Sequence, residues 1–306
     1  MQNRIVHQAK HNLLLTGASG HVGEETCRTL DSADRQVLAT DISAPVAVGA
    51  RLRTSGLSFF PCDLRQPEQI KELLAGRSVH TIIHLAGVLP TAFRAHPIAG
   101  AELNLSASVA LMKEAIRAGV KRFIFASSMS VYGSAPSLQP LTEVDPTAPD
   151  DPYGASKRAI ELVGEALASA HQIEFVALRI ARVVGPGIKK SSSLWRSQIF
   201  EPSSPAPIHI PFASDAKLSL VHVHDVAQML LALADAPEIK HLNYNTPAEI
   251  VEAGELKSMV ERTTGNRVEL GSPGAHAGPT CDGSRFANEF RFSPRKIEDH
   301  LSQLRK

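Results

Sequence analysis

Short apolar runs alternate with longer helical patterns through the first half of the chain. The runs cover residues 13–16, 37–40, 57–60, 81–86, 122–127 and 174–180, and 241–245 extends the series. They are apolar throughout rather than alternating, which is typical of strands covered on both faces. Helical patterns lie between them, at 22–30, 67–74, 97–118 and 153–170. This order predicts an α/β fold, a doubly wound parallel sheet of the Rossmann type with right-handed crossovers.

The composition of the chain changes after Arg182. Segments such as "GPGIKKSSS", "FEPSSPAPIHIP" and "GSPGAHAGP" are rich in Pro, Gly and Ser and predict mainly loops, which helical patterns at 224–234 and 253–264 interrupt. We therefore predict a Rossmann domain at 12–182, to which 220–245 returns. Residues 183–219 and 246–306 are predicted to form a smaller C-terminal substrate-binding lobe.

Composition narrows the classes of partner. The chain has 306 residues, of which 43% are hydrophobic and 21% charged, and its Lys and Arg residues are scattered at a net charge of +1. The basic patches typical of nucleic-acid or membrane-surface binding are not seen, so neither partner is expected. Three distant cysteines favour a reducing compartment, and no apolar run reaches the about 18 residues of a membrane span. The expected location is the cytoplasm.

The stretch "LLLTGASGHVG" sets Gly17, Gly20 and Gly23 three residues apart behind an apolar run. At a strand-to-helix turn such glycines allow a tight turn, the approach of a pyrophosphate to the backbone, and close packing of helix on strand. Asp41 follows at roughly the 20-residue distance at which an acid binds the ribose hydroxyls. Its carboxylate repels a 2′-phosphate, so NAD is predicted over NADP. Asp63 ends the third strand, where it either meets the adenine amine or caps the helix that starts near Pro67.

The stretch "DDPYGASKRAIE" places Tyr153 and Lys157 four residues apart, on one face of a predicted helix. An ammonium beside a phenol stabilises the phenolate and lowers a pKa that is normally about 10. A tyrosine tuned in this way exchanges a proton with a substrate hydroxyl while hydride moves to or from nicotinamide. Ser127, Ser128 and Ser130 gather at the end of the fifth strand, where a hydroxyl can hold the substrate oxygen against Tyr153.

Together these motifs resemble those of the extended short-chain dehydrogenases/reductases of the NAD-dependent epimerase/dehydratase type. The matching residues are "TGASGHVG" (16–23), Asp41, "CDL" (62–64), "HLAG" (84–87), Asn104, "SSMSVYG" (127–133), "PYGASK" (152–157) and "HVHDVA" (222–227). The resemblance implies that Tyr153 is the catalytic acid/base, that Lys157 lowers its pKa and binds the nicotinamide ribose, and that Ser128 is the hydroxyl partner. Besides Tyr153 and Lys157, it implies these NAD contacts: Gly17, Ser19, Gly20, His21, Val22, Gly23, Asp41, Asp63, Leu64, Leu85, Ala86, Gly87 and Asn104. It also implies a homodimer formed through the helices that begin near Pro97 and Tyr153.

Departures from the family pattern reduce the number of reaction types that are expected for this chain. Dehydratases of this type carry Thr-Asp-Glu where this chain has Ser128-Met129-Ser130, and elimination needs an acid and a base beyond Tyr153. Dehydration is therefore not expected, which leaves a dehydrogenase or a 4-epimerase. Arg182 replaces an Asn of the nucleotide-sugar enzymes, and two further diphosphate contacts are missing, which favours a smaller, sugar-like substrate. Expected substrate contacts are Ser128, Met129, Ser130, Val88, Arg182 and Arg196.

Charged and aromatic residues of the second half leave several interpretations open. Arg182, Lys189, Lys190 and Arg196 either attract a carboxylate or phosphate together or are solvated loop charges. His222 and His224 have strand spacing, but zinc needs further ligands and no metal is expected. Trp195, the only tryptophan, either covers a substrate or packs.

The sequence thus predicts an NAD-dependent oxidoreductase that acts on a secondary alcohol of a sugar or sugar-derived molecule. The alternative is a 4-epimerase that retains its NAD and acts through a transient keto intermediate. A further alternative is a non-catalytic NAD-binding protein, against which the intact Tyr-Lys pair speaks.

Overall fold

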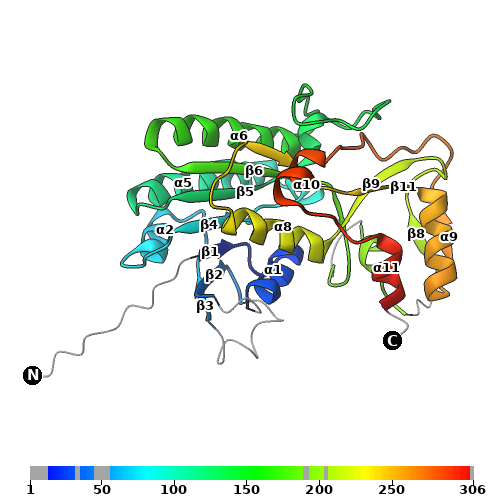
Figure 1. Ribbon diagram of the computed structural model, residues 1–306, viewed down its shortest axis with the longest axis horizontal. Coiled ribbons are helices and arrows are strands. Elements are labelled where there is room, and N and C mark those ends of the chain that lie inside the picture. Colours follow the sequence, from blue (N-terminus) through cyan, green and yellow to red (C-terminus); the bar gives the residue numbers. More distant parts are fainter. Residues whose placement is uncertain (1–12, 32–34, 45–55, 189–192, 203–205, 304–306) are drawn as a thin grey trace, which may run out of the picture.

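The computed structural model of the chain describes residues 13–31, 35–44, 56–188, 193–202 and 206–303. Seven strands form its central sheet (Figure 1), in the spatial order β10-β6-β5-β4-β1-β2-β3. These strands are β1 (Leu13–Thr16), β2 (Val37–Asp41), β3 (Leu57–Pro61), β4 (Thr81–His84), β5 (Arg122–Ser128), β6 (Glu174–Ile180) and β10 (Asn243–Asn245). All neighbouring pairs are parallel, which confirms the predicted doubly wound sheet. The strand order reverses between β1 and β4, where such sheets open a crevice for ligands.

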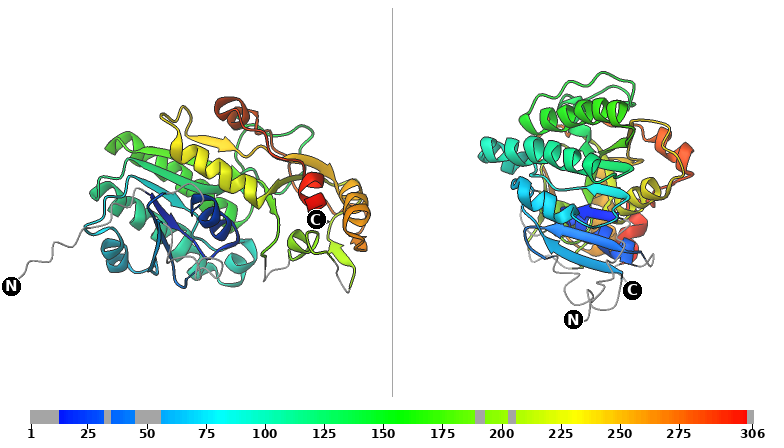
Figure 2. Two further views of the ribbon diagram at one scale, coloured as in Figure 1. Left: turned by 60° about the horizontal axis from the view of Figure 1, so that its bottom comes forward. Right: turned by 90° about the vertical axis from the view of Figure 1, so that its left-hand side faces the viewer.

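Helices cover both faces of the sheet (Figure 2). One face carries α2 (Pro67–Leu74), α5 (Ser108–Arg117) and α6 (Pro152–His171); the other carries α1 (His21–Asp31), α8 (Val223–Asp235) and α10 (Ser284–Phe290). Strand β1 shows why its sequence is apolar throughout. Leu14 packs toward α2, α5 and α6, whereas Leu13 and Leu15 pack toward α1 and α8, so that no residue of this strand faces water.

The segment 97–118, predicted as one helix, is divided. It consists of α4 (Pro97–Ala101), the π-helical turn η1 (Glu102–Ala107) and α5, and the short helix α3 (Pro90–Ala95) precedes it. A π turn bonds each amide one residue further back than an α-helix does and bulges the chain, often at a functional site. Asn104 lies in this turn and is buried.

A smaller lobe lies beyond the end of the sheet, built on short strands where the sequence predicts mainly loops. Strands β7 (Arg182–Val184), β9 (Lys217–His222) and β11 (Glu249–Glu252) form one sheet, and β8 (Ile208–Ile210) pairs with β12 (Val268–Leu270). Helices α7 (Trp195–Gln198), α9 (Ala253–Thr264) and α11 (Ile297–Ser302) belong to this lobe. Strands of three to six residues are too short to show a periodicity, so the pattern missed them. The exact domain boundaries remain a prediction.

Trp195 belongs to the core of this lobe. It is 3% exposed, and its ring lies edge-on against Phe212 with the centroids 6.2 Å apart. Of its two interpretations, packing is therefore the one that applies. None of the helices in the described ranges is long and apolar enough to cross a membrane.

Candidate functional site

The predicted glycine loop forms the turn between β1 and α1, at the crevice of the sheet. Gly17 has a φ of 71°, and a Cβ there would lie 2.6 Å from the amide nitrogen of Ala86. A Cβ on Gly23 would lie 2.0 Å from the carbonyl oxygen of Gly17. Both positions therefore require glycine for the fold itself. Gly20 is exposed and meets only its own loop, so its missing side chain leaves space for a ligand.

Asp41 ends β2 beside this loop. Its carboxylate accepts hydrogen bonds from the backbone amides of Ser19 at 3.0 Å and Ile42 at 2.7 Å, and the Ser19 hydroxyl bonds the carbonyl of Ser43. The loop that would hold a pyrophosphate and the acid that would hold a ribose are thus connected. His21 and Val22 follow at the start of α1, and the Nε2 atom of His21 is buried without a hydrogen-bond partner.

Asp63 does not cap a helix. Helix α2 starts at Pro67, and the residue before it, Gln66, makes no side-chain cap. The Asp63 carboxylate instead accepts from the Arg65 amide at 3.0 Å and from its guanidinium at 2.6 Å, which holds the pKa of Asp63 below its usual value. The capping interpretation is therefore wrong, and the adenine contact remains a prediction. Leu64, beside it, is buried.

The loop after β4 borders both the glycine turn and the predicted catalytic helix. The amide of Leu85 bonds the Thr16 carbonyl at 3.2 Å, and that of Ala86 the Thr16 hydroxyl at 3.3 Å. Asn104 fixes the other end of this loop, at Val88. Its side chain accepts from the Val88 amide at 2.8 Å and donates to the Val88 carbonyl at 3.1 Å. The buried Asn104 thus positions the loop that would line the cofactor.

Gly87 lies between these anchors. A Cβ there would be 3.0 Å from the amide oxygen of Asn104 and 3.7 Å from Nζ of Lys157. This glycine therefore lets the loop pass close to the ammonium group. His84, at the end of β4, bonds the Thr16 and Ser108 hydroxyls at 2.7 and 2.9 Å, and burial lowers its pKa to about 3. It is a neutral core residue.

The predicted catalytic side chains come together at the end of β5. Asp151 caps α6 and accepts from the amides of Tyr153 at 2.7 Å and Gly154 at 3.1 Å, so Tyr153 is fixed in the first turn. The Tyr153 hydroxyl interacts with the side chain of Ser128, the last residue of β5. The Ser128 hydroxyl also bonds Ser130 in the 3₁₀ turn η2 (Met129–Tyr132). Tyr153 and Ser128 are both 8% exposed.

Lys157 lies beside Tyr153 but does not act as predicted on its pKa. Its ammonium donates to the Ala126 carbonyl at 2.8 Å and lies 5.6 Å from the Tyr153 ring centroid. Burial raises the pKa of Tyr153 to about 12 and lowers that of Lys157 to about 8. The predicted lowering of the tyrosine pKa is wrong in this structure, because the loss of hydration of the phenolate outweighs the lowering by the Ser128 hydrogen bond and the Arg196 charge.

The predicted anion-binding cations are only partly described. Lys189 and Lys190 lie outside the described residues. Arg182 starts β7, donates to the Ala277 carbonyl at 2.9 Å and stacks on Phe212 at 4.8 Å, so it is not a solvated loop charge. Arg196, on α7, has a buried Nε without a hydrogen-bond partner, and its charge acts on Tyr153.

A buried network below the site was not predicted. Arg179 forms two hydrogen bonds with Glu161, at 2.9 and 2.8 Å, and donates to the Tyr132 hydroxyl at 2.8 Å. Glu161 also accepts from Ser127 at 2.6 Å, next to Ser128, and the Tyr132 hydroxyl bonds Asn245. Partners between 18 and 113 residues apart leave no local pattern, so no signal in the sequence could have found this network.

The histidines of "HVHD" have structural partners. His222 caps α8 by accepting from the His224 amide at 3.2 Å, and its ring stacks on His300 with the centroids 3.7 Å apart. His224 bonds Glu25 of α1 at 2.9 Å. Across the described part of the chain, no group of three or more His, Cys, Asp or Glu side chains is arranged to hold a metal ion.

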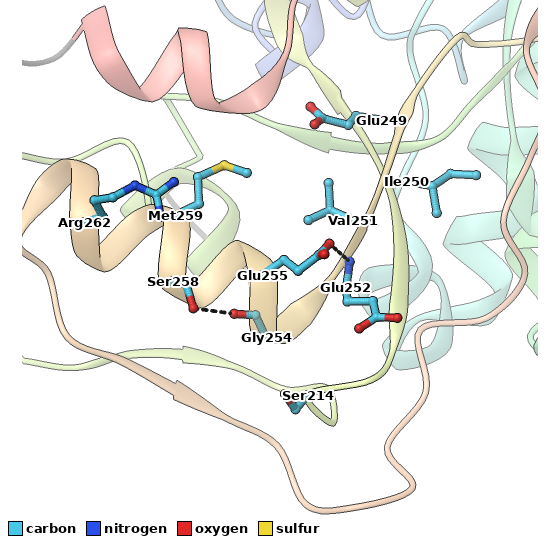
Figure 3. Close-up of a pocket in the computed structure, with 10 residues that line it drawn as sticks. All are labelled: Ser214, Glu249, Ile250, Val251, Glu252, Gly254, Glu255, Ser258, Met259 and Arg262. Atoms are coloured by element: carbon cyan, nitrogen blue, oxygen red, sulfur yellow. Dashed lines mark hydrogen bonds between the residues drawn. The ribbon is translucent and has the colours of Figure 1, made fainter.

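A hollow on the smaller lobe, between β11 and α9, contains none of the predicted site residues (Figure 3). Its polar groups are used locally: Glu255 accepts from the Glu252 amide at 3.3 Å, Ser258 donates to the Gly254 carbonyl at 3.0 Å, and Glu249 accepts from the Ile297 amide. The first two contacts lie at the start of α9, and the third attaches α11. The polar groups of the hollow thus serve the fold of the smaller lobe.

Comparison with known proteins agrees with this geometry. The model of the NAD dependent epimerase/dehydratase family matches residues 13–245. The chain belongs to this family. The family's dependence on NAD confirms the predicted cofactor, and the glycine turn and Asp41 are residues that fit it. A side chain at Gly17 or Gly23 would collide with backbone, and Gly20 leaves the loop open.

Individual relatives share about 30% of their residues with this chain over the matched segments. The chain is similar to the UDP-glucose 4-epimerase of Vibrio cholerae, with 29% identity over 74% of this chain and 67% of that protein. It is 30% identical to the UDP-glucose 4-epimerase of Halalkalibacterium halodurans over 56% of this chain and 51% of that protein. The match thus spans about half the length of several curated relatives. A solved structure, MoeE5 in complex with UDP-glucose and NAD, superposes with a TM-score of 0.80 and 27% identity over 96% of this chain and 97% of that chain.

Proposed function

We propose that this protein is an NAD-dependent oxidoreductase that transfers hydride between nicotinamide and a secondary alcohol of a sugar or sugar-derived substrate. The observation that carries the proposal is the meeting of the Tyr153 and Ser128 side chains at the end of β5, in a buried setting next to the cofactor crevice. A parallel sheet places its ligands at this edge.

Each residue has a distinct role in the proposed reaction. Ser128 holds the substrate oxygen, and the Tyr153 hydroxyl takes up or returns its proton. NAD, when bound, supplies the carbon that accepts or returns the hydride. Lys157 contributes a positive charge beside the phenol, and Asp151 fixes the helix turn that carries Tyr153. Because Asp151 is committed to that cap and the Ser128-Met129-Ser130 triplet has no carboxylate, the chain lacks a second acid/base pair there for dehydration.

A 4-epimerase is the second candidate, because the curated relatives cited above are UDP-glucose 4-epimerases. The two candidates differ in the fate of the hydride. A dehydrogenase releases NADH, whereas an epimerase returns the hydride to the other face of its keto intermediate. Sugars, aldonates, uronates and UDP-sugars should be screened with added NAD, following both the absorbance of NADH and the configuration of the product. NADH accumulation supports the dehydrogenase, and inversion without NADH contradicts it in favour of the epimerase.

Asp41 is expected to set the choice of cofactor. The wild-type protein should bind NAD at least about tenfold more tightly than NADP, since a charged hydrogen bond to the ribose is lost and a 2′-phosphate is repelled. Replacing Asp41 with Ser should shrink that ratio by about tenfold. Calorimetric titration with each dinucleotide measures it. Asp215→Ser, which removes an exposed carboxylate before β9, is the control. Equal affinities of the wild type for both cofactors would contradict the assignment.

We also propose that the protein is a homodimer formed through α5 and α6. In support, these helices leave apolar side chains in water: Val109 is 39% exposed and Leu162 is 50% exposed. Light scattering should give a mass twice the 32.9 kDa of one chain. Leu162→Glu should shift the protein toward the monomer, whereas Leu138→Glu, at a fully exposed loop position, should not. A monomeric wild type at micromolar concentration would refute the proposal.

A further inference from the structure

Four arginines that are wholly or partly buried divide into two classes. Arg179 is bound by both oxygens of Glu161, and Arg122 pairs with Glu174 at 2.7 Å and donates to the carbonyls of the α8 end. Arg182 and Arg196 have no carboxylate partner among the described residues. A buried charge without a partner is costly, so it persists where something else supplies the opposite charge.

Arg196 lies close enough to the proposed reaction centre for its charge to act on Tyr153. Its carbonyl accepts from the Gly185 amide at 3.0 Å, and the neighbouring Ser197 hydroxyl accepts from the Gly187 amide at 3.1 Å, so the turn that carries it is held in place. The Arg196 charge acts on Tyr153 and on His21 of the glycine loop. Its Nε donor is nevertheless buried and unbonded, a hydrogen bond left for a ligand.

Arg182 is held by contacts within the smaller lobe. One of its nitrogens donates to the Ala277 carbonyl, and its plane lies over the Phe212 ring, which orients the guanidinium from the smaller lobe. Burial and the charge of Arg196 together lower the pKa of Arg182 to about 10. Each guanidinium charge thus makes the charged form of the other less favourable. One oxyanion bound between the two groups stabilises both charges.

We propose that Arg182 and Arg196 form an oxyanion subsite beside Tyr153, which selects substrates that carry a carboxylate or phosphate close to the reacting hydroxyl. This inference rests on the proposed function and narrows its substrate to an acidic sugar derivative. We assign the oxyanion to the substrate rather than to the dinucleotide because Arg182 is oriented by Phe212 and Ala277, which both belong to the smaller lobe.

Binding to the NAD-saturated protein tests the subsite without requiring turnover. The probes are D-glucuronate, D-gluconate and inorganic phosphate, with D-glucose as the neutral match, each titrated by calorimetry. At least one acidic probe should bind the wild type more tightly than D-glucose. Arg182→Met and Arg196→Met should each weaken that probe by about tenfold or more, and Arg196→Lys by less, because lysine keeps the charge but not the fork. The affinity for D-glucose should change less than about twofold, since it makes no charged contact.

Two results would overturn the subsite. The first is that no acidic probe binds the wild type better than D-glucose does. The second is that the Met variants weaken NAD itself, measured without any probe, by the factor expected for the acidic ligand, because the arginines would then serve the cofactor's phosphates. If an acidic probe binds as expected but no substrate is oxidised or inverted, the proposed function fails while the subsite stands.

Thermal stability separates a ligand-binding role from a structural one. Without ligand, Arg182→Met and Arg196→Met should leave the melting temperature unchanged or raise it, because each removes a buried charge that lacks a partner. Arg179→Met, which breaks a complete and fully buried ion pair, should lower it. A drop for Arg196→Met as large as that for Arg179→Met would assign the guanidinium to the fold and contradict the proposal.

Discussion

Replacing Tyr153 with phenylalanine is expected to lower kcat by about 10²–10⁴-fold, the contribution of a positioned acid/base, while the affinity for NAD stays near that of the wild type. The variant removes one oxygen atom and keeps the buried ring over which Lys157 lies. Stopped-time assays of NADH formation or product configuration measure the first effect, and calorimetric titration with NAD measures the second.

The chain offers a matched control for this prediction. Tyr244→Phe removes the same atom from a buried tyrosine of β10, whose hydroxyl accepts from the His241 amide at 3.2 Å, on the other core face of the sheet. It should keep its kcat within about threefold, because it makes no contact with the reacting groups. Full activity of Tyr153→Phe would contradict the assignment of Tyr153 as the acid/base and would remove the basis of the proposed reaction.

The second large effect concerns stability. Arg179→Met leaves Glu161, which is 3% exposed, as a buried carboxylate without its main partner, and should cost about 3–5 kcal/mol of the free energy of unfolding. Urea denaturation followed by circular dichroism measures this loss. The mutation also removes the donor to the Tyr132 hydroxyl, so the turn η2 below the site should loosen with it.

Two further variants make that measurement decisive. Arg158 pairs with the same carboxylate at 3.0 Å but is 28% exposed, so Arg158→Met should cost less than about 1 kcal/mol. The double variant Arg179→Met/Glu161→Leu replaces the pair by apolar groups and should recover much of the stability lost by the single variant. A loss below about 1 kcal/mol for Arg179→Met would show that Glu161 finds other compensation.

The cofactor half of the molecule could be predicted from the sequence because its signals are local. The strands are apolar throughout since both faces of the sheet are covered, and the three glycines recur at a fixed spacing within one turn. Tyr153 and Lys157 lie on one helix, so their spacing alone brings them together. In each case the pattern itself lies within a short stretch of the chain.

Other properties depend on contacts that no local pattern contains. Burial decides the pKa of Tyr153, and the sequence shows its neighbours along the helix but not the side chains that exclude water from it. A helix cap was one of two interpretations of Asp63, but its carboxylate accepts from the guanidinium of Arg65, two residues further along the chain, instead. The short strands of the smaller lobe follow from pairing between distant segments, such as β9 with β7 and β11.

The π turn at Glu102–Ala107 lets one helical segment both hold the cofactor loop through Asn104 and fill the core with its later residues. A regular α-helix would not place both sets of side chains correctly. Each residue of an α-helix rotates the next by about 100°, so an extra residue in one turn offsets everything beyond it by that angle. The offset lets Asn104 reach the Val88 backbone while Leu111, Met112 and Ala115 still lie in the core. Removing one residue from this turn would therefore break either the contact of Asn104 with Val88 or the packing of Leu111, Met112 and Ala115 in the core. A length change of a single amino acid here should be less well tolerated than many side-chain substitutions on the same helix.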